Sequence, residues 1–126
     1  MSLELVSFSA QLLLGQGITY YSKATGNAND LSTWGTNTDG SGTAPASFIL
    51  GDIFEVRNGS SLTTNAAWNI ASTVSNAATL RIASGGTLTA SHAITFTRPS
   101  TPATIFNIQN GGIYNHNVTN DIAATV

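Results

Sequence analysis

One nine-residue phrase occurs three times at a constant step, and this recurrence restricts the fold more than any other feature of the chain. The three segments are FEVRNGSSL (54–62), LRIASGGTL (80–88) and FNIQNGGIY (106–114). Their glycines, Gly59, Gly85 and Gly111, follow one another at a constant 26-residue step. A series of hairpins has no reason to keep a constant step, whereas each coil of a solenoid stacks on the one before it. We therefore predict an all-β fold, a parallel β-helix (β-solenoid) with 26-residue coils.

The apolar residues on both flanks of each glycine fall on even-numbered positions, which predicts one face of every strand as the core. Because equal positions of successive coils lie above one another, each column stacks like on like. The predicted inward set is Phe54, Val56, Leu62, Trp68, Ile70, Leu80, Ile82, Leu88, Ile94, Phe96, Phe106, Ile108, Tyr114, Val118 and Ile122.

The glycines mark a corner of the coil, where at least one of them should have a positive φ. The residues expected at this structural turn are Asn58, Gly59, Ser84, Gly85, Asn110 and Gly111. The asparagines and the serine between them are expected to form a hydrogen-bonded ladder along the corner.

The 26-residue register also places Arg81 beside Glu55 on the outer face of adjacent coils. The two side chains should form an inter-coil ion pair, worth only about 0.2–1 kcal/mol because it is exposed.

The domain organisation follows from the same step. Residues 51–126 should form three coils, at about 54–79, 80–105 and 106–126. Residues 18–50 are predicted to be a capping segment with a Gly/Ser/Thr loop. Residues 1–17 are apolar and have two interpretations: a strand that caps the fold, or the remnant of a signal peptide.

The surface of this protein must be built from Thr, Ser, Asn and Gly, because only 8% of its residues are charged. Such surfaces are common in secreted β-rich proteins. The net charge is −2 and the four basic residues are scattered, so nucleic-acid binding is not expected. There is no cysteine. No segment approaches the roughly 20 apolar residues of a membrane-spanning helix.

No catalytic constellation is evident in the sequence. Glycoside hydrolysis needs two carboxyl groups at a defined separation, but the 26-residue step aligns Asp52 with Ala78 and forms no carboxylate column. His92 and His116 lack a third candidate ligand, so no metal or other cofactor is predicted. The loop NTDGSG (37–42) has only half of a calcium-loop pattern and is better interpreted as a turn.

Two surface features have functional interpretations. The rings of Tyr20, Tyr21 and Trp34 are candidates for weak ligand contact, with a glycan as the expected ligand, although Trp34 is better suited to capping the first coil. The pairs TLT (87–89) and TFT (95–97) suggest a threonine ladder that binds ice, but the register aligns Thr87 with Ser61 and with an isoleucine. Ice binding is therefore not favoured.

The segment LSTWGTNTDGSGTAPASFILGDIFEVRNGSSLT resembles the first coil of β-helical regions in secreted, sorting-domain-bearing cell-surface proteins of the Bacteroidetes type. The residues that carry the resemblance are Trp34, Pro45, Gly51, Asp52, Val56, Gly59 and Leu62. It extends over about residues 18–96 and implies a right-handed β-helix on a secreted or cell-surface protein, of which this chain would be an N-terminal fragment.

Together these features favour a non-catalytic structural or adhesion module whose partner is a glycan or another surface protein. Two alternatives remain: a carbohydrate-binding module of a larger extracellular enzyme, and a solenoid that self-associates end to end through its open coil ends.

Overall fold

The computed structural model describes residues 17–98, 104–119 and 123–125, and within these ranges the protein is all-β apart from one 3-10 turn, η1 (Leu31–Thr33). The strands are short, and glycine-containing turns separate many of them. They are β1 (Thr19–Ser22), β2 (Thr25–Asn27), β3 (Trp34–Gly35), β4 (Ile53–Val56), β5 (Ser61–Thr63), β6 (Trp68–Ala71), β7 (Thr79–Ile82), β8 (Thr87–Ala90), β9 (Ile94–Thr97), β10 (Ile105–Ile108), β11 (Ile113–His116) and β12 (Ala123–Thr125).

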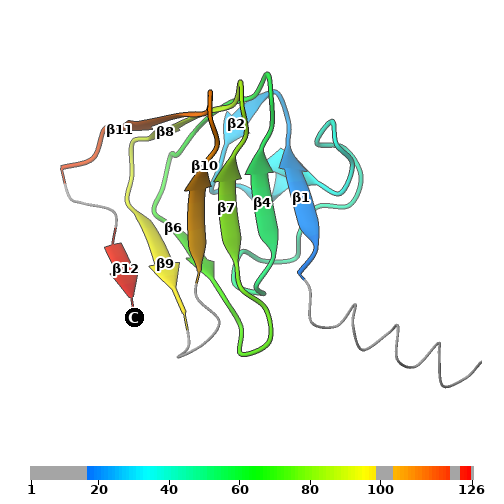
Figure 1. Cartoon of the computed structure of the whole chain (residues 1–126), viewed down its shortest axis with the longest axis vertical. Helices are drawn as coiled ribbons and strands as arrows, with labels where there is room; N and C mark the ends of the chain where they lie inside the picture. The colour runs from blue at the N-terminus through cyan, green and yellow to red at the C-terminus, as the bar shows by residue number, and fades with distance from the viewer. Residues whose placement is uncertain (1–16, 99–103, 120–122, 126) are drawn as a thin grey trace, which may run out of the picture.

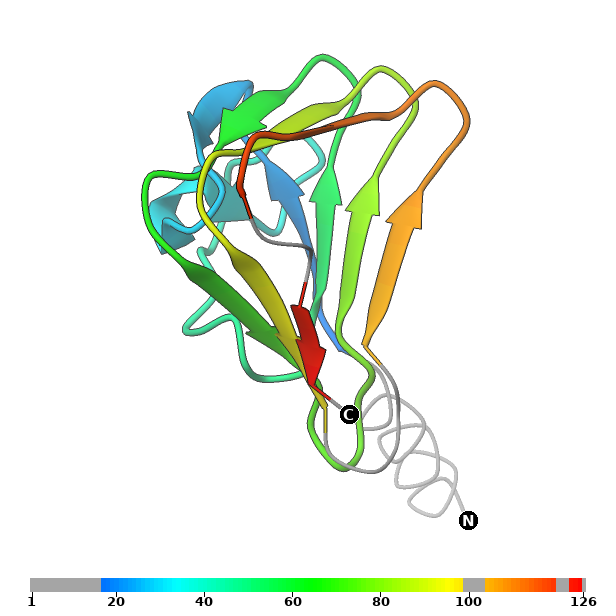
Figure 2. The same ribbon diagram turned by 90° about the vertical axis from the view of Figure 1, so that its left-hand side faces the viewer.

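These strands form three sheets, in the orders β10-β7-β4-β1-β3, β11-β8-β5-β2 and β12-β9-β6. Every pairing is parallel except that of β1 with β3. From β4 onward the chain visits the three sheets in turn and then returns to the first (Figure 1). Figure 2 shows the sheets enclosing the interior from three sides. Parallel pairing requires such a crossover, because a tight hairpin can join only antiparallel strands.

We call each set of strands that stacks as one layer on the next set a rung; among the described residues the N-terminal rung has no strand in the third sheet. The N-terminal rung contains β1, β2 and β3, the first rung β4–β6, the second β7–β9 and the third β10–β12. Between the first and second rungs every Cα partner lies one 26-residue step further along the chain, as in Phe54↔Leu80, Leu62↔Leu88 and Ile70↔Phe96. The predicted step is thus the observed register across this interface.

The step changes at both ends of the molecule. Thr19 pairs with Ile53 and Thr25 pairs with Ser61, and both of these steps are longer than the one between the first and second rungs. The extra residues lie in the segment that holds η1, β3 and the loop before β4. At the other end Ala124, and not Ile122, is the partner of Phe96, so the predicted alignment of Ile122 with Phe96 is wrong. The step from Phe96 to Ala124 is two residues longer than the repeat, and Ile122 itself lies outside the described residues.

The core confirms the predicted inward face in the first and second rungs, where all of the even-numbered apolar residues named above are buried. β-Branched and aromatic residues alternate there with Thr, Asn, Glu and Arg, which is the pattern of a half-buried strand. The third rung differs. Phe106 and Tyr114 are only partly buried, and Ile108 is 45% exposed, so the prediction that it is a core residue is wrong. Within the described residues no strand pairs with the outer edge of β10.

An aromatic cluster fills the interior at the N-terminal end. Trp34 in β3 lies 5.4 Å from Phe54 and 6.0 Å from Trp68, measured between ring centroids, and Phe48 packs on both. The indole Nε1 of Trp34 donates to the carbonyl of Ala28 at 2.9 Å. This aromatic cluster packs at the end of the core where β1 and β3 lie in one sheet and β2 lies in another.

None of the helical structure in the described ranges is long and apolar enough to cross a membrane.

Candidate functional site

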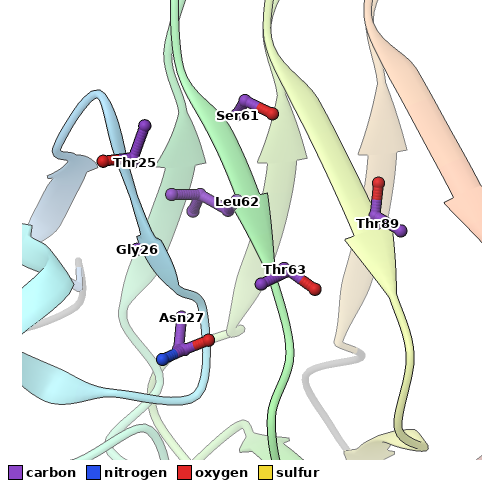
Figure 3. A pocket seen from close by; sticks show the side chains of 7 residues that line it. All are labelled: Thr25, Gly26, Asn27, Ser61, Leu62, Thr63 and Thr89. Carbon is purple, nitrogen blue, oxygen red and sulfur yellow. The ribbon is translucent and has the colours of Figure 1, made fainter.

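The candidate site is an open groove of about 460 Å³ on the outside of the sheet that contains β2, β5 and β8. Figure 3 shows its lining drawn from these three adjacent strands. The lining residues are Thr25, Gly26, Asn27, Ser61, Leu62, Thr63 and Thr89. None of them is charged, and apart from Leu62 and Gly26 all have hydroxyl or amide side chains.

Strand alternation decides which groups reach this groove. Leu62 is buried, so its neighbours Ser61 and Thr63 must point outward, and both are exposed. In β2 the register pairs Thr25 with Ser61 and Asn27 with Thr63. In β8 Thr89 pairs with Thr63. The sequence interpretation missed β2, because its step to β5 is longer than the repeat; the pattern Thr-Gly-Asn, which resembles the Thr-x-Thr of β8, was the available signal.

Most polar side chains of the groove make no hydrogen bond with other described residues of the protein. Thr89 Oγ1 accepts a hydrogen bond of 3.2 Å from Asn115 Nδ2. In the part of the chain that the structure describes, the side chains of Thr25, Asn27, Ser61 and Thr63 make no hydrogen bond with the protein. They are therefore free to bond with water or with a ligand.

At the corner between β1 and β2 and the corner between β4 and β5, by contrast, the polar side chains are hydrogen-bonded within the protein. Ser22 Oγ donates to Ser60 Oγ at 2.7 Å, and Ser60 Oγ donates to the carbonyl of Lys23 at 2.8 Å, with both serines buried. The Arg57 guanidinium donates to the carbonyl of Ser22 at 2.7 Å. A buried polar group without a partner costs about 1–3 kcal/mol, so these hydrogen bonds stabilise the folded state.

The predicted ligand contacts of Tyr20 and Trp34 are contradicted by their burial. Tyr20 is 6% exposed and stacks on Phe54 at 5.7 Å, and Trp34 is 1% exposed in the aromatic cluster. Both face inward because they have the parity of the core. Tyr21 faces outward, but it lies beside Glu55 on the sheet of β1 and β4, away from the groove. The three rings do not form a common platform.

The predicted glycine corner is present, and its hydrogen bonds differ from those expected. All three glycines have φ between 80° and 86°. Gly59 N donates to the Gly85 carbonyl at 3.0 Å, and Gly85 N donates to the Gly111 carbonyl at 3.0 Å. The backbone thus forms the ladder. No hydrogen bond joins the side chains of Asn58, Ser84 and Asn110 among the described residues, because the Asn58 and Ser84 side chains lie over the glycine of the next rung.

The predicted ion pair between the first and second rungs is present. Arg81 Nε lies 2.8 Å from Glu55 Oε1, and the two residues are direct Cα partners in the parallel pair β4–β7. Both side chains are partly exposed. This contact helps to hold the register rather than to form a reactive centre.

Two further carboxylates, those of Asp52 and Asp39, accept hydrogen bonds from other residues of the protein. Asp52 is buried and accepts a hydrogen bond of 3.0 Å from the backbone N of Ile18. Burial raises the pKa of Asp52, and the hydrogen bond opposes this. Asp39 accepts bonds from both the hydroxyl and the backbone N of Ser41, which lower the pKa of Asp39. The loop at 37–42 is thus a self-bonded turn.

The two histidines do not form a metal site. Nδ1 of His92 lies 3.1 Å from the carbonyl of Thr64, and Nδ1 of His116 lies 2.8 Å from the hydroxyl of Tyr114. Both histidines are exposed. Within residues 17–98, 104–119 and 123–125, no three His, Cys, Asp or Glu side chains are grouped to hold a metal ion.

Comparison with protein-family models, with curated proteins and with solved structures finds no significant match for this chain.

Proposed function

We propose that the chain forms a parallel β-helix that acts as a non-catalytic structural or adhesion module of a secreted or cell-surface protein. The observation that supports this most is the in-register stacking of the rungs on a continuous apolar core. The resemblance of residues 18–96 to β-helical surface proteins adds the right-handed form and the extracellular location to the proposal.

The proposed mechanism is mechanical. Stacked rungs resist bending because evenly spaced backbone hydrogen bonds join each rung to the next along the stack. Three of the described carboxylates, Asp39, Asp52 and Glu55, are engaged in contacts within the protein, which supports a scaffold rather than acid–base chemistry. The uncharged groove supplies a surface to which a glycan or a surface protein can adhere.

The test is adhesion without turnover. Beads coated with the purified chain are washed at increasing flow over surfaces carrying glycans or extracellular proteins, with albumin-coated beads as the control. The proposal expects retention of the coated beads on at least one surface and no release of sugar or peptide fragments into the buffer. Release of fragments that rises with time and with protein concentration would contradict it, since it would make the chain an enzyme.

A second proposal, self-association, is supported by the third rung. Ile105, Ile108 and Ile113 are each about half exposed, and β10 and β11 are the outermost strands of their sheets. Unpaired strand edges accept further strands. Sedimentation velocity over a wide concentration range tests this: dimers that weaken on Ile108→Lys support it, and a monomer at every concentration excludes it.

A further inference from the structure

The outer face of the sheet β11-β8-β5-β2 contains two parallel columns of short side chains. The register makes Thr25, Ser61, Thr87 and Ile113 one column, and Asn27, Thr63, Thr89 and Asn115 the other. Neighbouring members of a column are about 4.8 Å apart, and the two columns are about 6.6 Å apart, as strand geometry requires. Hydroxyl and amide groups occupy every position except that of Ile113.

The groove described above lies over the β2, β5 and β8 part of these columns. Its free side chains, those of Thr25, Asn27, Ser61 and Thr63, can each both donate and accept a hydrogen bond. A ligand that brings hydroxyl groups can replace the bound water at each position with little loss, because exposed groups have no internal bond to break. The array therefore fits a ligand that is rich in hydroxyls.

The ligand should also be uncharged and extended. No residue of the two columns is charged, so the face offers no partner to a carboxylate or a sulfate. The polar groups repeat from strand to strand, along the stacking direction of the rungs. An extended sugar polymer presents hydroxyls at a comparable repeat, about one sugar residue for each strand.

We propose that this groove binds an extended neutral polysaccharide whose chain crosses the strands and follows the two columns. This inference rests on the proposed adhesion function and assigns that function to one face and to one class of ligand. A peptide would instead add to the edge of a sheet through its backbone, and the groove lies on a face. A uniform lattice such as ice is matched less well, since Ser61, Asn27 and Asn115 interrupt the threonines.

The test is a pull-down of the purified chain with particles of cellulose, chitin and insoluble mannan, with alginate gel as the anionic comparison. The variant Thr25→Val with Thr63→Val removes two hydroxyls from the groove and keeps the shape and the β-propensity of the side chains. Thr79→Val, on the outer face of β7 in a different sheet, is the matched control. Circular dichroism verifies that all the variants fold.

We expect binding to at least one neutral polymer, at least about tenfold weaker in the double variant and unchanged in Thr79→Val, because each lost hydrogen bond accounts for a several-fold change. The inference is overturned if the wild-type chain binds none of the three neutral polymers, if it prefers alginate, or if the double variant binds as well as the wild type. Thermal hysteresis that the double variant loses would also overturn it, in favour of ice. Polysaccharide binding that survives the double variant removes the groove assignment but leaves the adhesion function standing.

Discussion

The second and third rungs share one strand pattern but differ in burial. Ile82 in β7 and Ile108 in β10 are direct Cα partners in the same column, yet Ile82 is 0% exposed and Ile108 is 45% exposed. The second rung has a rung on each side, whereas the described residues cover the third on one side only. The alternating pattern thus determines which face of a strand points inward, and the neighbouring rungs determine how much free energy that face contributes.

The largest expected effect comes from truncating this column. Ile82→Ala should lower the free energy of unfolding by about 2–5 kcal/mol, because it leaves a cavity between two rungs. Ile108→Ala removes the same atoms from a half-exposed position and should cost less than about 1 kcal/mol. Urea titrations followed by circular dichroism measure both values. Equal losses for the two variants would show that stacking does not control burial.

The glycines before β8 and β11 extend the comparison to the backbone. A Cβ at Gly86 would collide with the carbonyl oxygen of Val56, and one at Gly112 would lie 2.7 Å from the carbonyl oxygen of Ile82. Gly86→Ala should cost about 1–3 kcal/mol, because its rung is held from both sides. Gly112→Ala should cost less, since the third rung can move outward. The thermal midpoints of the two variants test this order. A larger drop in the midpoint for Gly112→Ala than for Gly86→Ala would contradict it.

At the N-terminal end of the core, the two stacked tryptophans Trp34 and Trp68 should differ in how much they contribute to stability, by less than the isoleucines above. Trp34 donates to Ala28, whereas the buried Nε1 of Trp68 has no partner among the described residues. Trp34→Phe should therefore be more destabilising than Trp68→Phe by about 1–2 kcal/mol, because only the first leaves a buried carbonyl without its donor. Denaturant unfolding of the two variants gives the difference, and a greater loss for Trp68→Phe would contradict the assigned hydrogen bonds.

The smallest expected effect is a pH dependence at Asp52, at the start of the first rung. Because burial raises the pKa of Asp52 in the folded state, ionisation costs stability, and the cost appears as the pH rises through this pKa. Asp52→Asn should match the wild type at about pH 3 and be more stable at pH 7 by less than about 1 kcal/mol, since the carboxylate keeps one hydrogen bond.

Asp39→Asn is the control for this measurement, because the pKa of Asp39 is shifted in the opposite direction and its effect on stability should therefore change with pH in the opposite direction. Hydrogen bonds from Ser41 lower the pKa of Asp39, so its stabilising contribution is present at neutral pH and is lost as the pH falls through the folded-state pKa. Thermal midpoints across the pH range distinguish the two. A stability difference for Asp52→Asn that grows on acidification would exclude the proposed effect of burial.

The sequence was sufficient for the register between the first and second rungs, since Gly59, Gly85 and the apolar columns keep one constant step. It was not sufficient for β1 and β2, because a long loop precedes β4 and lengthens the step from each of these strands to its partner. Tyr20 and Trp34 lie before the constant repeat, so the repeat does not assign their even parity to the core; the sequence alone favours a ligand contact for Tyr20, and a cap or a ligand contact for Trp34. The groove was not predicted from the sequence, because Thr25 and Asn27 form one side of it and the constant step does not place β2 beside β5.

The stacking register itself is tested most directly by introduced disulfides, since the chain has no cysteine of its own. Ser61→Cys with Thr87→Cys, and Thr63→Cys with Thr89→Cys, join direct partners whose Cα atoms should be about 4.8 Å apart, within disulfide range. The crossed pairs, Ser61 with Thr89 and Thr63 with Thr87, should be about 8 Å apart and outside it. We predict that mild oxidation closes both direct pairs and neither crossed pair, as read by mass spectrometry of peptides. Efficient closure of the crossed pairs, or failure of both direct pairs, would contradict the 26-residue register.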